Sequence, residues 1–125
     1  KTMIEKGPFV RFAWGPSTDT RLNHHPIAPK GVDPHLWQGR GFEEAPIDQL
    51  FLRVERQTIT PFPSHNLSFF TIKTYFYHIT QVIKDPLVKE GLIQSLLSMS
   101  DENLRYKGLF GQRDKIVDRL KKEFP

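Results

Sequence analysis

One short run holds the densest set of side chains that could do chemistry. Arg53, Glu55 and Gln57 are spaced two apart, and alternate residues of a β-strand point to the same face. A carboxylate and a guanidinium beneath an apolar cover would line a pocket, because buried charge is costly unless it is paired or used. The alternative is a solvated strand face whose charges pair across a hairpin with Lys73. Pattern alone favours the solvated face, because exposed antiparallel faces are common.

The elements around this run indicate an α+β fold. Period-two alternation predicts a strand over about 50–60, and a run dense in Phe, Tyr, Thr and Ile predicts a second strand over about 66–83. The turn-forming residues between the two strands predict an antiparallel hairpin. Asp85 followed by proline predicts a helix start, Ser100 followed by two acidic residues predicts another, and apolar residues at helical spacing continue to the C-terminus. Because the strands precede the helices, the order is that of an α+β domain.

The second predicted strand carries apolar side chains on both faces. Phe70 and Ile72 point one way and Phe69 the other, so we expect both faces of the sheet to be covered. A shorter strand is predicted at 9–14. The proline- and glycine-rich stretch 15–49 is expected to be an ordered covering segment, anchored by aromatic and apolar side chains, which are Trp14, Leu36 and Trp37.

Length and charge exclude several classes of protein. The 125 residues fit one domain, and because the sequence begins at Lys1 we expect residues 1–125 to be a single domain or the C-terminal fragment of a longer one. The net charge of +4 is spread evenly, so no nucleic-acid partner is expected. No apolar run reaches the ~20 residues that a membrane span needs. The lack of a signal-peptide pattern favours an intracellular, cytoplasmic location.

The metal-ligating residue types form no known motif. There is no cysteine, which excludes disulfides and thiolate metal sites. No two of the five histidines have the i, i+4 spacing of a helical zinc site, so no metal site is predicted from them. The sequence also lacks the glycine-rich signature of dinucleotide sites and the nucleophile elbow of many hydrolases.

Two runs joined by a proline-bearing turn, 52–58 and 70–75, together resemble the core signature of the haem-dependent oxidative N-demethylase family. Two flanking elements fit the same resemblance: Arg11 with Trp14 upstream, and 106–109 downstream. The family's characterised members are catalytic subunits of dimethylamine monooxygenases. The resemblance implies a PAS-like antiparallel sheet whose inner face holds haem b. It further implies oxygen-dependent removal of a methyl group from a small amine, with electrons from a separate flavin and iron–sulfur reductase.

The resemblance also implies roles for three residues. Glu55 would face the haem pocket, pair with the alkylammonium group and orient its methyl group. Arg11 would hold that carboxylate ionised or bind a haem propionate. Tyr75 would line the pocket as a hydrogen-bond donor, with a core aromatic as the alternative. The axial ligand of the haem is expected to lie outside this chain.

A non-catalytic module is the competing interpretation. The same sheet could bind haem or another small molecule and pass a conformational signal through the last helices, because a fold does not fix a function.

Overall fold

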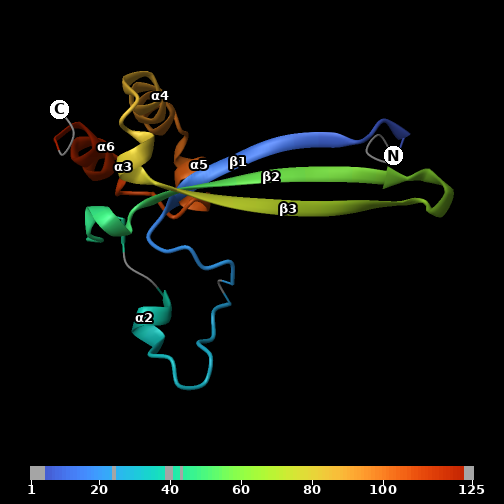
Figure 1. Ribbon diagram of the computed structural model, residues 1–125, viewed down its shortest axis with the longest axis horizontal. Helices are drawn as coiled ribbons and strands as arrows, with labels where there is room; N and C mark the ends of the chain where they lie inside the picture. The colour runs from blue at the N-terminus through green and yellow to red at the C-terminus, as the bar shows by residue number, and fades with distance from the viewer. Residues whose placement is uncertain (1–4, 24, 39–40, 43, 123–125) are drawn as a thin grey trace.

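The chain forms a three-stranded antiparallel sheet followed by helices, with strand order β1-β2-β3 (Figure 1). A computed structural model describes residues 5–23, 25–38, 41–42 and 44–122. The elements are β1 (Phe9–Ser17), α2 (Pro34–Gln38), the 3-10 turn η1 (Ile47–Gln49), β2 (Phe51–Phe62), the 3-10 turn η2 (Pro63–His65), β3 (Leu67–His78), α3 (Ile79–Val82), α4 (Pro86–Leu97), α5 (Asp101–Tyr106) and α6 (Arg113–Lys122). The predicted α+β class, the hairpin and the C-terminal helices are confirmed.

The predicted second strand ends earlier than expected. β3 ends at His78, and the chain then turns into α3 instead of continuing to residue 83. Ile79 and Ile83 are four residues apart, and both are buried in the core. One helical turn brings the two side chains within about 6 Å of each other along the helix axis, whereas an extended chain would separate them by about 13 Å.

Two helices, α4 and α5, begin at the residues that the capping pattern predicts. The Asp85 carboxylate accepts hydrogen bonds from the backbone N–H groups of Leu87 and Val88 at 2.9 and 3.4 Å. The Ser100 hydroxyl accepts one from the backbone N–H of Asn103 at 3.3 Å. Each cap satisfies N–H groups that have no partner within the helix. No helix in the described ranges is both long and apolar enough to cross a membrane.

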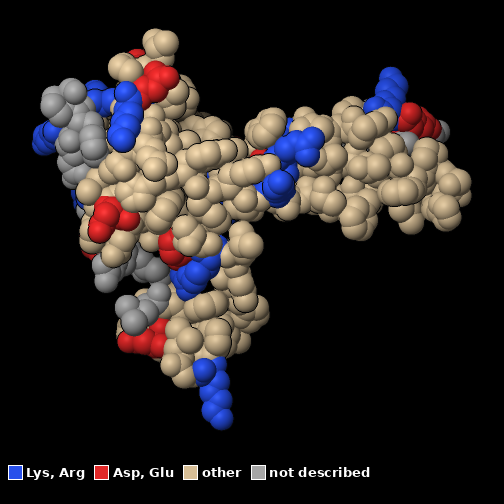
Figure 2. Space-filling model, viewed as in Figure 1, with Lys and Arg blue, Asp and Glu red and all other residues tan. Residues whose placement is uncertain are grey.

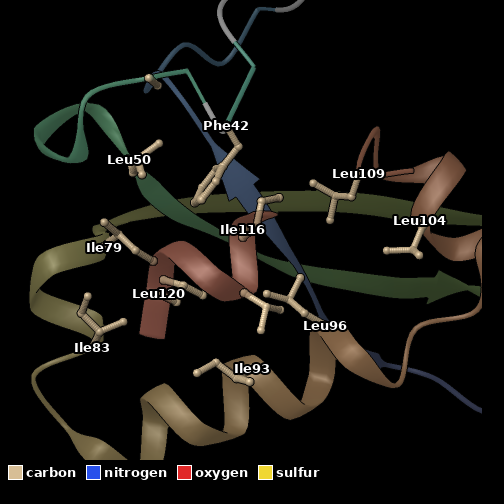
Figure 3. Packing of buried hydrophobic residues seen from close by; sticks show 12 residues of the cluster. Phe42, Leu50, Ile79, Ile83, Ile93, Leu96, Leu104, Leu109, Ile116 and Leu120 are labelled. Carbon is tan, nitrogen blue, oxygen red and sulfur yellow. The ribbon is translucent and has the colours of Figure 1, made fainter. Parts of the chain in front are cut away.

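The core lies at one end of the sheet. Figure 1 shows α3, α4, α5 and α6 gathered there, while the strands extend away from them. Figure 3 shows side chains from α4, α6 and the segment before β2 meeting in this core. Its members are Phe42, Ala45, Leu50, Ile79, Ile83, Ile93, Leu96, Leu104, Leu109, Ile116, Val117 and Leu120, with Trp14 packed against them.

The segment 15–49 covers the core only through its last part. Phe42 and Ala45 are buried, and the Arg119 guanidinium of α6 donates to both of their carbonyl oxygens, at 3.0 and 2.6 Å. The earlier part forms its own small cluster, in which the Arg21 guanidinium lies 4.5 Å from the centre of the Trp37 ring. The side chain of Leu36 lies outside the described residues.

The expectation that both sheet faces are covered is wrong for the described residues. The described helices pack only on the end of the sheet beside the core, so no described residue covers either face of the far end. Phe12 and Phe69 on one face and Ile72 on the other are 66%, 61% and 51% exposed. Figure 2 shows few charged side chains on this extended part in the face in view.

Replacing Ile116 by alanine should lower the free energy of unfolding by about 2–5 kcal/mol, because it removes a fully buried side chain and leaves a cavity. The matched control is Leu87→Ala, whose side chain is 84% exposed and whose effect should stay within about 0.5 kcal/mol. Urea unfolding followed by circular dichroism measures both. Equal effects of the two substitutions would contradict this placement of the core.

Candidate functional site

An open cleft of about 320 Å³ lies over β1 and β2, toward the end of the sheet where the helices gather. It is lined by Ala13, Trp14, Gly15, Pro16, Arg53, Glu55, Gln57, Tyr106 and Lys107. The strand register explains the hollow: Ala13 is the cross-strand neighbour of Glu55, and Gly15 that of Arg53. Because both β1 residues are small, they leave open the space beside the two charged side chains.

Four polar side chains form a hydrogen-bonded chain across this face of the sheet. The Arg11 Nε donates to Gln57 Oε1 at 2.6 Å, and Gln57 Nε2 donates to Glu55 Oε2 at 2.9 Å. The other carboxylate oxygen, Glu55 Oε1, forms an ion pair with an Arg53 Nη at 2.9 Å. Gln57 is the buried member, at 8% exposure, and the Glu55 side chain is 18% exposed. The carboxylate is therefore held at both oxygens, and the cleft lies beside it.

Lys107 reaches the cleft from the end of α5. Its ammonium group donates a hydrogen bond to the backbone carbonyl oxygen of Trp14 and lies 5.3 Å from the centre of the Trp14 ring. Burial lowers the pKa of Lys107 below its ordinary value of 10.5, the nearby Arg53 charge lowers this pKa further, and the Glu55 charge opposes both effects. The ammonium group therefore lies within electrostatic range of the two charged residues of β2.

The structure brings together two of the three residues predicted for the site. Glu55 lines the cleft, and Arg11 lies on the same sheet face but bonds to Gln57, not to the carboxylate. Tyr75 pairs with Val54, so its side chain lies on the opposite face, stacked 6.4 Å from Tyr77. Tyr75 does not line this cleft.

The ion pair that the solvated-face alternative predicted between β2 and Lys73 does not form at Glu55. Lys73 is the cross-strand neighbour of Arg56 and lies on the face opposite Glu55, so it cannot pair with that carboxylate. The residue that sequence reasoning missed is Lys107. Lys107 belongs to the run 106–109 that resembles the family, but the neighbouring residues in the sequence do not indicate a role for it.

The described residues provide an apolar surface beside the cleft but no iron ligand in it. Beyond Arg11, the same sheet face continues with an apolar surface suited to a flat macrocycle, made of Phe9, Ile59, Phe70 and Ile72. No described histidine lines the cleft. His78 is on this face, but Nδ1 is hydrogen-bonded to the Thr80 hydroxyl and Nε2 to the Asp48 carbonyl oxygen, at 2.7 and 2.8 Å. Within the described ranges, no cluster of three or more His, Asp or Glu could hold a metal ion.

Two substitutions should move the pKa of Lys107 in opposite directions. Arg53→Gln should raise it, because a nearby positive charge is removed, and Glu55→Gln should lower it further, because the opposing negative charge is removed. Titration of the ¹³Cε resonance of Lys107 by NMR measures both shifts. The exposed Lys115 serves as the internal control and should not respond. Shifts of the same sign in both variants would contradict the geometry of the cleft.

The relation of this chain to known proteins follows from its sequence match. No curated protein matches the chain. A family model described as haem-dependent oxidative N-demethylase, alpha subunit-like, matches residues 1–117. This range includes β1, β2 and Lys107, and so every residue that lines the cleft. The chain belongs to the haem-dependent oxidative N-demethylase alpha subunit-like family.

Proposed function

We propose that this protein removes a methyl group oxidatively from a small methylated amine, with oxygen as co-substrate and haem b bound next to the cleft. Membership of the family supports haem-dependent chemistry. The observation that carries the proposal for the amine is the Glu55 carboxylate, which is 18% exposed and held beside the cleft by Arg53 and Gln57. A methylated amine is a cation at neutral pH, and it binds a partly desolvated carboxylate more strongly than one in bulk water.

The haem site would combine the apolar sheet surface with the cations that border it. The macrocycle would lie on Phe9, Ile59, Phe70 and Ile72. Arg11 would bind a propionate, because a guanidinium has five N–H donors and the Gln57 bond uses one of them. The axial ligand would come from outside the described residues. The PAS-like arrangement of the whole site is part of the same proposal.

The reaction balances with a reductase as the second partner. When bound, haem supplies the oxidising power that inserts one oxygen atom of O₂ into a methyl C–H bond. Two electrons and two protons reduce the other oxygen atom to water, and a separate flavin and iron–sulfur reductase in the cytoplasm would supply the electrons. The resulting N-hydroxymethyl amine breaks its C–N bond and releases formaldehyde and the demethylated amine.

Glu55 and Gln57 have distinct roles in this scheme. Glu55 pairs with the substrate ammonium and so fixes where its methyl groups point. Gln57 acts as a positioning residue, since its amide holds one oxygen of that carboxylate. Holding the reacting groups in one geometry is a large part of catalysis, and a displacement of 1 Å can cost about 100-fold in rate.

Glu55→Gln should lower kcat/KM for dimethylamine by about 100-fold or more, because it keeps the shape of the side chain and removes the charge that binds and orients the amine. Formaldehyde release and oxygen uptake by the haem-loaded protein, with a chemical reductant supplied, measure this effect. The matched control is Glu102→Gln on the exposed surface of α5, which should retain full activity. Circular dichroism checks that both variants fold.

Three outcomes would count against parts of this proposal. Unchanged activity in Glu55→Gln would show that the carboxylate does not act on the substrate. A visible haem spectrum without turnover of any methylated amine would favour the non-catalytic binding or sensor module. A purified protein that neither contains nor takes up haem would overturn both interpretations.

A further inference from the structure

A simple amine would pair with only one of the charges that line the cleft. Two cations, Arg53 and Lys107, and one anion, Glu55, line it. Glu55 is already paired with Arg53 at 2.9 Å. Lys107 forms no ion pair within the part of the chain that the structure describes, and its ammonium group contacts the neutral carbonyl and ring of Trp14. The cleft therefore holds a positive charge with no described counter-charge.

A dialkylammonium ion could pair with Glu55, which keeps lone pairs beside its bonds to Arg53 and Gln57. It would leave the charge of Lys107 without a partner. A substrate that also carries a carboxylate would pair with both charges, because its carboxylate offsets Lys107. Carboxylates form strong charge-assisted hydrogen bonds with lysine ammonium groups.

We propose that the substrate class is an N-methylated amino acid, whose ammonium group pairs with Glu55 and whose carboxylate pairs with Lys107. This inference rests on the demethylation proposed above and names its substrate.

The dimensions and donors of the cleft fit this class. Its volume of about 320 Å³ is within the range of small-molecule sites. The ammonium and carboxylate groups of an α-amino acid are separated by one carbon, and Glu55 and Lys107 line the same cleft. A lysine ammonium has three N–H donors, and the Trp14 carbonyl takes one of them, which leaves donors for a ligand.

A carboxylate could reach Lys107 from two sources, the substrate or a haem propionate. The two sources differ in what they predict for binding. If the substrate supplies the carboxylate, N,N-dimethylglycine should bind better than dimethylammonium. If the propionate supplies it, Lys107 should affect haem content and should not distinguish the two compounds.

The deciding experiment is titration calorimetry on the intact, haem-loaded protein with N,N-dimethylglycine and with dimethylammonium chloride. N,N-dimethylglycine should bind at least about tenfold more tightly, which is the effect of one good charge-assisted hydrogen bond. Lys107→Met should reduce this preference by about tenfold, and Lys107→Arg should retain part of it. Lys115→Met, which changes an exposed lysine of α6, should leave both affinities unchanged.

Each result decides a separate question. Equal binding of the two compounds overturns the substrate class, and loss of haem in Lys107→Met together with equal binding assigns this lysine to the propionate. Formaldehyde release from dimethylamine in either case leaves the demethylase proposal standing. Tight binding of N,N-dimethylglycine without formaldehyde release from either compound supports the ligand class and overturns the reaction.

Discussion

The hydrogen bond from the Gln57 amide to the Glu55 carboxylate is the interaction on which the site depends. An amide can donate and accept at once, so Gln57 joins the Arg11 guanidinium to the Glu55 carboxylate without adding a charge of its own. Gln57 is buried, and a buried polar group is costly unless it is hydrogen-bonded. Both of its partners are therefore held in place, and a carboxylate engaged once at each oxygen still has lone pairs to offer a ligand.

The cleft depends equally on the small side chains of the neighbouring strand, β1. Ala13 and Gly15 are the cross-strand neighbours of the two charged residues of β2. Larger side chains there would contact Glu55 and Arg53 directly, because cross-strand neighbours lie about 5 Å apart at their Cβ atoms. A Cβ added at Gly15 would meet no atom within 4 Å, so the space beside this residue is open.

Local sequence patterns predicted the helices and strands better than they predicted which face of the sheet each side chain occupies. Alternation along β2 and the caps at Asp85 and Ser100 are encoded within a few residues, and the structure has each of them. The face that Tyr75 occupies depends on the register of the hairpin, because a shift of one residue exchanges the two faces of a strand. Lys107 could not be placed from the sequence, since its position depends on how α5 lies against β1, more than ninety residues from Trp14 along the chain. The open far end of the sheet was missed because apolar residues on both faces indicate a cover without saying which residues supply it.

The face that carries the cleft is divided along the strands into two regions of different chemistry. Arg53, Glu55, Gln57 and Arg11 form the charged and polar region, and the next cross-strand row, made of Phe9, Ile59 and Phe70, is apolar. The division falls at Arg11, whose cross-strand row contains Gln57 and Ile72. The reaction that we propose needs both environments side by side, because the ammonium of the substrate requires a counter-charge and a haem macrocycle requires a surface from which water is easily displaced. Alternation on one pair of long strands supplies both, since every second residue faces the same way and the residue types change from polar to apolar along the strand.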